Sequence, residues 1–188
     1  MEHEKIAPRV ARFINPFGND HDWVNWFEFT LRPEWRENGN EPDEFGATRK
    51  DSDITVIAND DASKHIVKTL QAMYEEYCES YLDRPYKEAG KEPMDGDQVG
   101  MYSSKYRERG ISRPHRDDML TEDTGKYTIV WYINDDYEGG ELGFTDPDLG
   151  TEIKPDAGDV FIFPSYFEHY GASVTKGLKY INILKQYF

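Results

Sequence analysis

The sequence predicts an α+β fold that is mainly β: a jelly roll supported by helices nearer the N-terminus. Three observations lead to this prediction. From residue 98 onward, short β-type segments alternate with turns rich in Gly, Pro and Asp. A single long amphipathic helix pattern precedes them. Aromatic residues make up 14% of the chain, which is typical of a packed core and not of a disordered polypeptide.

Composition limits the classes of function. The chain has 188 residues, enough for one domain with a hydrophobic core, and a formal net charge of -15. That charge repels a phosphate backbone, so no nucleic-acid partner is expected. Cys78 is the only cysteine, which excludes an internal disulfide and Cys-based zinc sites. No apolar run has the length of a signal peptide or membrane span, so we expect a soluble, cytoplasmic protein with no membrane partner.

Two helices are predicted in the first half of the chain. Residues 22–30 place several aromatic side chains on one side, and Asn19 or Asp20 is the expected cap. The second helix begins at Asp60 or Asp61 and keeps a 3.6-residue apolar period to about Leu82. We expect these helices to cover one face of a sheet.

Strands and long polar segments fill the rest of this half. Residues 6–17 indicate a short strand and a turn, and residues 54–58 indicate a second strand. Residues 32–53 and 83–97 are rich in charge, Gly and Pro. Such long loops are usually functional lids or disordered.

The second half predicts eight short strands. They cover residues 98–103, about 113–117, 126–134, 140–145, 151–154, 159–163, 169–174 and 178–187. This spacing favours a double-sheet jelly roll. We therefore expect residues 1–188 to form a single domain, in which 1–97 supply helical support and lid loops and 98–188 form the jelly-roll core.

His115 and Asp117 are candidate metal ligands. In a strand, residues two positions apart point to the same face. A 2-His-1-carboxylate centre needs such a pair and one further His. Of the five histidines, His169 follows a buried strand, whereas His3, in a terminus expected to be mobile, His21 and His65 are expected to be surface or capping residues. On its own, a His and an Asp at this spacing also fit a histidine satisfied by a nearby carboxylate.

Lys179 is a candidate anion-binding residue. On the last predicted strand it shares a face with Ile181 and Ile183. A buried ammonium beside apolar residues is costly unless it meets an anion. The lysine is therefore either exposed at the beginning of the strand or paired with a carboxylate at the bottom of a pocket.

Together these motifs resemble the catalytic core of the Fe(II)/2-oxoglutarate-dependent dioxygenases, most closely the prolyl 4-hydroxylase branch. The resemblance covers residues 98–188, about half of the chain. The motifs are 115–117 (HRD), 131–136 (WYINDD), 139–142 (GGEL), 157–165 (AGDVFIFPS), 169–171 (HYG) and 174–180 (VTKGLKY).

The resemblance implies a double-stranded β-helix and a role for each site residue. His115, Asp117 and His169 are the implied iron ligands, and Lys179 is the implied partner of the 2-oxoglutarate C5 carboxylate. Tyr102 and Tyr132 are implied co-substrate residues, with core packing as the alternative for both. Strand periodicity points Asp118 and Arg116 away from the iron.

The resemblance also implies an activity, which is hydroxylation of a peptidyl proline, as by procollagen-proline 4-dioxygenase. Fe(II), 2-oxoglutarate and O₂ are the implied cofactors, succinate and CO₂ the co-products, and ascorbate the reductant. A proline-containing peptide or protein is the implied partner. The segments 32–53 and 83–97 are candidate lids over it, and Arg107 and Arg109 either line its entrance or are solvated.

The chain departs from the prolyl pattern in two places. Ser112 stands where many prolyl hydroxylases have Tyr, and Gly125-Lys126 where many have Arg. Because both places lie near the substrate, the same chemistry on a free amino acid, another protein side chain or a small metabolite is the alternative. Asp117 keeps the carboxylate ligand, which disfavours the halogenase variant. A jelly-roll binding module without catalysis is the third hypothesis.

Overall fold

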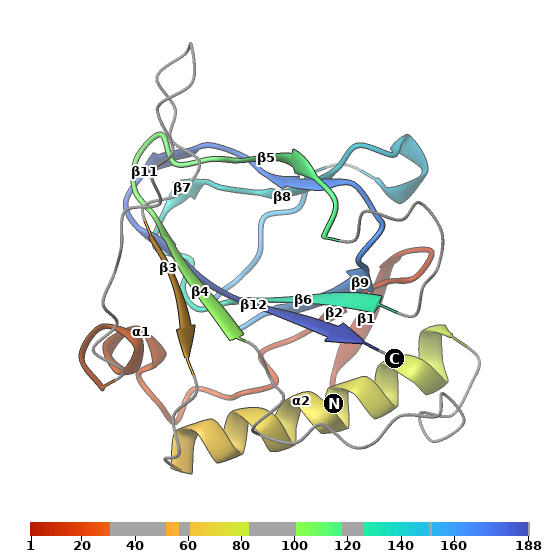
Figure 1. Ribbon diagram of the computed structural model, residues 1–188, viewed down its shortest axis with the longest axis horizontal. Helices are drawn as coiled ribbons and strands as arrows, with labels where there is room; N and C mark the ends of the chain where they lie inside the picture. The colour runs from red at the N-terminus through yellow and green to blue at the C-terminus, as the bar shows by residue number, and fades with distance from the viewer. Residues whose placement is uncertain (31–51, 57–60, 83–100, 118–125, 151, 188) are drawn as a thin grey trace.

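A computed structural model describes residues 1–30, 52–56, 61–82, 101–117, 126–150 and 152–187. The fold is mainly antiparallel β with few helices, as the sequence predicts (Figure 1). Two layers of strands face one another, and a long helix lies outside the larger layer. The predicted jelly roll is confirmed.

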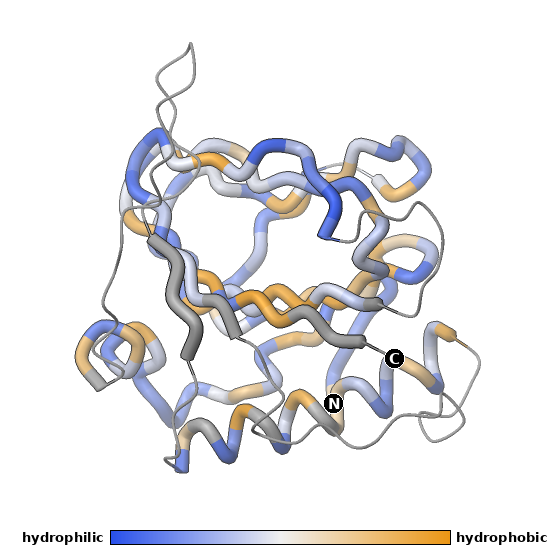
Figure 2. The backbone as a smooth tube through the Cα atoms, in the orientation of Figure 1, coloured by the Kyte–Doolittle hydropathy of each residue, from blue (hydrophilic) through white to orange (hydrophobic). Residues whose placement is uncertain are grey.

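The larger layer is a seven-stranded antiparallel sheet. Its strand order is β1 (His3–Ala7), β2 (Val10–Phe13), β9 (Val160–Pro164), β6 (Lys126–Tyr132), β12 (Lys179–Tyr187), β4 (Met101–Tyr106) and β3 (Ser52–Val56). Hydrophobic residues concentrate on its middle strands (Figure 2). Val160–Pro164 is buried at every position, because one face of the sheet meets the helix and the other meets the second layer.

The smaller layer consists of two short sheets. One has the order β5 (Ser112–His115), β10 (His169–Gly171) and β8 (Leu142–Phe144), and the other pairs β11 (Val174–Lys176) with β7 (Glu138–Gly139). A short 3₁₀ helix, η3 (Pro147–Leu149), follows β8. Between the layers, Val130, Tyr132, Phe161, Phe163 and Ile181 form one core cluster.

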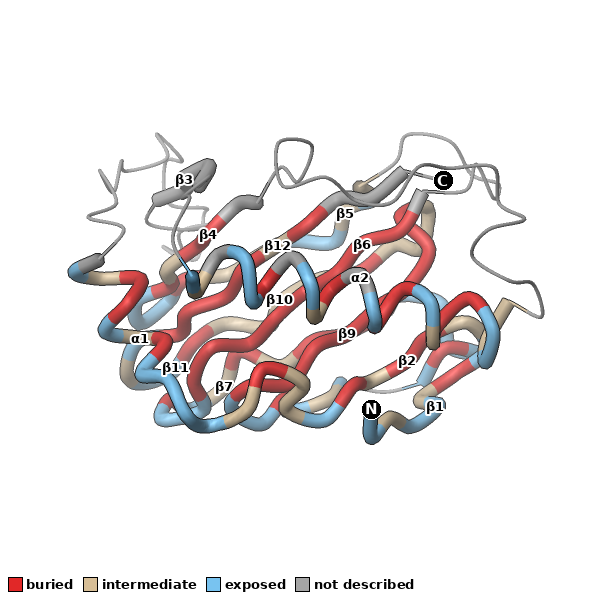
Figure 3. The backbone as a smooth tube through the Cα atoms, turned by 90° about the horizontal axis from the view of Figure 1, so that it is seen from below, coloured by how far each residue is buried: buried red, intermediate tan, exposed pale blue. Residues whose placement is uncertain are grey.

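The long helix α2 (Asp61–Tyr81) covers the outer face of the larger sheet (Figures 1 and 3). The residues of its apolar face that are fully buried are Ile66, Leu70, Met73, Tyr74 and Tyr77. They pack against the alternate face of the strands, which carries Ile129, Trp131 and Ile162. The predicted helix and its buried face are thus confirmed. Among the described residues, no helix is both long and apolar enough to cross a bilayer.

The N-terminal segment differs in two respects from the sequence prediction. Residues 6–17 were expected to hold one strand and a turn, but β1 and β2 form a hairpin. His3 was expected in a mobile terminus and instead lies in β1, with its Nδ1 2.7 Å from the Tyr81 hydroxyl and its Nε2 3.1 Å from Glu76. Tertiary contacts with α2 thus order a segment that has little apolar content of its own.

The first helix also differs. It is a short α-helix, α1 (Trp23–Asn25), that continues as a π-helix, η1 (Trp26–Thr30). Asp22 caps it, in place of Asn19 or Asp20, because its Oδ1 lies 2.9 Å from the Asn25 amide.

Strand boundaries shift by a few residues. β3 begins at Ser52, within the predicted loop 32–53; the rest of that loop and the segment 83–97 lie outside the described residues. The prediction over 140–145 corresponds to β7 and β8, and that over 169–174 to β10 and β11. Of the strand predicted over 151–154, the described residues 152–154 form a single bridge, between Ile153 and Leu142.

Candidate metal centre and co-substrate cavity

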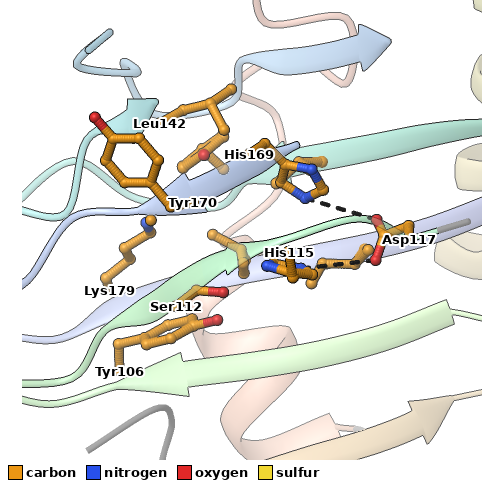
Figure 4. A pocket seen from close by; sticks show the side chains of 13 residues that line it. Tyr106, Ser112, His115, Asp117, Leu142, His169, Tyr170 and Lys179 are labelled. Carbon is orange, nitrogen blue, oxygen red and sulfur yellow. Dashed lines mark ion pairs between the residues drawn. The ribbon is translucent and has the colours of Figure 1, made fainter. Parts of the chain in front are cut away.

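Three candidate ligands converge at one end of the smaller layer (Figure 4). β5 and β10 pair so that the Cα atoms of His115 and His169 are directly opposite. Asp117 follows two residues after His115, and one ligand atom from each residue lies within 4.8 Å of the others. Among the described residues, this is the group with the donors and spacing for a metal ion. The cross-strand register therefore joins two histidines that are 54 positions apart in sequence.

Both imidazoles turn Nε2 toward the centre. The Nδ1 of His115 lies 2.7 Å from the Arg113 carbonyl oxygen, and the Nδ1 of His169 lies 3.0 Å from that of Phe167. A carbonyl only accepts, so Nδ1 is the donor in each of these bonds and Nε2 is the nitrogen left for a metal. Each Nε2 is 3.7 Å from one oxygen of Asp117. Two imidazole nitrogens and a carboxylate then face one point, a donor set that fits a divalent iron.

Asp117 is fixed by two buried hydroxyl groups. Thr128 Oγ1 donates to Asp117 Oδ2 at 2.8 Å, and Ser165 Oγ lies 2.9 Å from Thr128 Oγ1. The Asp117 amide donates to the Ser165 carbonyl at 3.0 Å. β5 ends at His115, so the prediction that strand pairing extends through Asp117 is wrong: this contact with the turn after β9 replaces the ladder. Arg116 is exposed, and Asp118 lies outside the described residues.

A cavity of about 130 Å³ connects the three candidate ligands with Lys179. Its walls come from both layers. The lining residues are Tyr106, Ser112, His115, Asp117, Val130, Tyr132, Leu142, His169, Tyr170, Gly171, Lys179, Ile181 and Ile183. Neither Arg107 nor Arg109 is among these described lining residues, and both are exposed.

Lys179 lies at the closed end of the cavity and is 3% exposed. Its Nζ donates to the Gly140 carbonyl at 2.6 Å and lies 5.1 to 5.9 Å from the ring centres of Tyr132, Tyr106 and Tyr137. Burial, reinforced by the nearby Lys154 cation and opposed by Glu141, lowers the pKa of Lys179 to about 7. Of the two sequence alternatives, the exposed strand-end lysine is wrong. An anion entering the cavity would restore the favourable environment of the ammonium.

The tyrosines that line the cavity differ from those that the sequence predicted. Tyr132 lines the cavity at 2% exposure, and burial raises its pKa well above the usual value. Tyr102 lies on β4 with its Cα opposite Ile183, and its side chain lies outside the described part. Tyr106, on the same strand, lines the cavity, and the sequence analysis missed it. The available signal was the even spacing of 102, 104 and 106 along one strand.

Two small residues border the cavity beside Lys179. Ser112 and Gly171 are Cα partners across β5 and β10. A Cβ added at Gly171 would lie 3.5 Å from the Ser112 Cβ and 3.6 Å from the Lys179 Nζ. The space next to the ammonium is therefore open because neither strand has a large side chain there.

Sequence comparisons show which known family and protein part of the chain is similar to. Residues 101–184 match the family model of the 2OG-Fe(II) oxygenase superfamily. A segment of 77 residues is 38% identical to a PKHD-type hydroxylase of Maricaulis maris strain MCS10, over 39% of this chain and 35% of the relative. The chain thus spans about a third of the length of that curated relative. The family implies Fe(II), 2-oxoglutarate and O₂, and the His-Asp-His group has the donors for the metal.

Solved structures then identify the branch whose fold the chain shares. A prolyl-4-hydroxylase of Pseudomonas putida aligns over 96% of this chain and 93% of its own, with a TM-score of 0.69 at 14% identity. A Trichoplax adhaerens prolyl hydroxylase in complex with a hypoxia-inducible-factor peptide fragment gives 0.64 at 12% identity, over 95% and 83% of the two chains. The viral collagen prolyl hydroxylase of Paramecium bursaria Chlorella virus-1 gives 0.60 at 17%, over 96% of both. The match over residues 101–184 supports the resemblance to the Fe(II)/2-oxoglutarate-dependent dioxygenases, and the solved structures show that the chain has a prolyl 4-hydroxylase-like fold.

Proposed function

We propose that the protein is an Fe(II)- and 2-oxoglutarate-dependent dioxygenase that hydroxylates a proline residue in a peptide or protein. The observation that carries this proposal is one cavity with His115, Asp117 and His169 at one end and Lys179 at the other. We propose too that residues 1–188 act as a single domain, since α2 packs against strands of the catalytic core.

The metal would be held by the Nε2 atoms of His115 and His169 and by a carboxylate oxygen of Asp117. Three protein ligands on one side leave positions open for a chelating co-substrate and O₂, which supply the oxidising chemistry when bound. The chain's own part is to orient the imidazoles so that each Nε2 faces the metal position. The Arg113 and Phe167 carbonyls would do this by accepting the Nδ1 protons.

The far carboxylate of 2-oxoglutarate would pair with Lys179. The ammonium is buried and donates to a neutral acceptor, the Gly140 carbonyl, so a carboxylate would supply the negative charge that balances it. Tyr106 and Tyr132 would enclose this end and exclude water, which strengthens the ion pair. The aliphatic part of the co-substrate would lie against Val130, Leu142 and Ile181.

A peptidyl proline is supported by the fold and by one solved relative. The Trichoplax adhaerens enzyme, which has the same fold, is described with a peptide fragment bound. Succinate and CO₂ would be the co-products and ascorbate the reductant that maintains Fe(II). A proline-containing partner also suits the acidic chain when basic residues flank the target.

The test is turnover of proline-rich peptides with Fe(II), 2-oxoglutarate and ascorbate, followed as succinate and as a product heavier by one oxygen atom. The expected result is both products in the native protein and neither in His115→Ala or Asp117→Ala. Full turnover in either variant would refute the metal assignment. If the native protein failed to bind Mn(II) and 2-oxoglutarate together, whichever was added first, a binding module without catalysis would be the better description.

A second substrate class is favoured by Ser112. This residue lines the cavity where many prolyl hydroxylases have a tyrosine, so the opening differs in shape and polarity. The same chemistry on a free amino acid, another protein side chain or a small metabolite is the corresponding candidate. A substrate screen that follows 2-oxoglutarate consumption separates the two, because only the proline hypothesis requires stimulation by proline-containing peptides.

A further inference from the structure

The Lys179 ammonium is hydrogen-bonded to a turn, residues 137–140, that ends in two glycines. The acceptor of its hydrogen bond is the carbonyl of Gly140, and Gly139 and Gly140 have φ angles of 74° and 70°. This left-handed backbone favours glycine. A Cβ at Gly140 would lie 2.9 Å from the Tyr137 ring and 3.1 Å from Cδ of Lys179, so the turn packs directly on the lysine stem. Anything that fixes this turn also fixes the ammonium.

Lys154 also donates hydrogen bonds to this turn. Its Nζ donates to the carbonyl of Tyr137 at 3.0 Å and to that of Gly139 at 2.8 Å. The same ammonium lies 3.4 Å from the centre of the Tyr137 ring, which is within cation–π range. Lys154 itself is anchored, because the preceding Ile153 exchanges two backbone hydrogen bonds with Leu142. Three interactions of one side chain thus converge on the residues just before Gly140.

Tyr137 lies close to both lysines. It is 5% exposed, and its ring centre lies 3.4 Å from the Lys154 Nζ and 5.9 Å from the Lys179 Nζ. Lys154 is outside the cavity lining, whereas Lys179 is part of it. Burial lowers the pKa of Lys154, and the Lys154 cation contributes to the lowered pKa of Lys179. The two lysines therefore hydrogen-bond to carbonyls of the same turn: Lys154 to those of Tyr137 and Gly139, and Lys179 to that of Gly140.

We propose that Lys154 is a positioning residue for co-substrate binding: it clamps the Tyr137–Gly140 turn and so holds Lys179 where it meets the far carboxylate of 2-oxoglutarate. Lys154 touches neither the co-substrate nor the metal. This inference rests on the proposed function, since it assigns a supporting residue to the same cavity. Its role is geometric, so losing it weakens co-substrate binding without changing the metal ligands.

The experiment is calorimetric titration of 2-oxoglutarate into the full-length protein loaded with Mn(II), a metal that permits binding without turnover. Lys154→Met is expected to raise the Kd for 2-oxoglutarate about tenfold, as is typical when an outer partner of a site is lost. The Kd for Mn(II) alone is expected to stay unchanged. Lys154→Arg keeps the charge and the donors, and is expected to restore most of the affinity.

The matched control is Lys176→Met. Lys176 is an exposed lysine of β11 whose Nζ lies 2.8 Å from Glu138, so its removal changes the net charge equally near the same turn without touching the clamped carbonyls. It is expected to leave the Kd for 2-oxoglutarate within twofold of the native value. Hydrogen exchange gives the structural readout: Lys154→Met is expected to speed amide exchange in residues 137–142, and Lys176→Met is not.

The outcomes separate this inference from the proposed function. If the native protein binds Mn(II) and 2-oxoglutarate but Lys154→Met binds both equally well, the clamp is refuted and the function stands. Equal weakening in Lys176→Met and Lys154→Met also refutes the clamp, because charge alone then explains the effect. If the native protein binds neither ligand, the proposed function fails first. A thermal melt of each variant confirms that folded protein is compared.

Discussion

Lys179 shows how one residue can be identified in sequence while its state is set by its surroundings. The strand pattern places it in line with Ile181 and Ile183, and the structure buries it at the closed end of a cavity. Burial and the nearby Lys154 cation lower the pKa of Lys179 to about 7. Co-substrate binding and proton uptake at Lys179 should therefore be linked.

A pH dependence follows from this linkage. Below pH 7 the lysine is charged before 2-oxoglutarate arrives; above pH 7 binding must also take up a proton. With Mn(II) saturating, the Kd for 2-oxoglutarate is expected to rise with pH between 7 and 9, approaching about tenfold per unit. Lys179→Met is expected to bind weakly and without this slope. A native Kd that is flat over this range would contradict the linkage.

Gly171 tests the space beside the same ammonium. A Cβ at this position would lie 3.6 Å from the Lys179 Nζ, where the far carboxylate is proposed to bind. Gly171→Ala is expected to raise the KM for 2-oxoglutarate several-fold while the Mn(II) affinity is retained. The control is Gly150→Ala on the surface, where an added Cβ meets nothing within 4 Å. Because φ is 101° at Gly150, this substitution is expected to lower stability and to leave the KM for 2-oxoglutarate unchanged. An unchanged KM for 2-oxoglutarate in Gly171→Ala would show that the far carboxylate does not bind beside Gly171.

Thr128 tests the support of the candidate carboxylate ligand. Because it donates to Asp117 and is fully buried, Thr128→Val keeps the shape and removes the hydrogen bond. The Mn(II) Kd is expected to increase about 10- to 100-fold, the usual cost of losing such a partner. Thr128→Ser retains the hydroxyl and is expected to bind nearly as the native protein does. Calorimetry without co-substrate measures both.

At the scale of elements, the pairing of β5 with β10 positions the candidate ligands, whereas the packing of α2 stabilises the sheet. The first brings His115 opposite His169. The second buries one helix face and stabilises the sheet from outside. Element existence was largely readable from periodicity, since the 3.6-residue pattern predicted α2 and alternation predicted most strands. The boundaries of these elements could not be predicted, because a strand ends where its pairing with a neighbouring strand ends. β5 ends at His115, and the Asp117 amide instead donates to the Ser165 carbonyl.

The helix–sheet interface gives a stability prediction. Leu70 is fully buried between α2 and the sheet, and Lys68 on the same helix is exposed. Leu70→Ala is expected to lower the free energy of unfolding by about 2–5 kcal/mol, through lost burial and the cavity left behind. Lys68→Ala is expected to change it by less than about 0.5 kcal/mol. Urea denaturation measures both, and similar values would show that α2 is not part of the cooperative core.

At the scale of the whole molecule, the candidate site lies between two layers and its residues come from strands distant in sequence. A metal and co-substrate that bind only the folded state should stabilise the entire fold. At a ligand concentration of 100 times Kd the gain is about 2.7 kcal/mol. Thermal melts are expected to show a higher Tm with Mn(II) and 2-oxoglutarate together, and chelation with EDTA should reverse it. His169→Ala is expected to lose the shift, and a shift that persists there would place the ligands outside this cavity.

The sequence by itself determined the residue types and their order: the strand pattern, the helix with its buried face, the His-x-Asp pair, the later His and the Lys ten positions beyond it. These follow from local periodicity and from the few side chains able to bind a metal or a carboxylate. Only the tertiary structure decided that Tyr106 lines the cavity, that Asp22 caps the first helix, that Thr128 donates to Asp117 and that Lys154 donates to the Tyr137 carbonyl. Period two gives the face on which a side chain lies, but which strand lies opposite, and in what register, depends on hydrogen bonds between segments far apart in sequence.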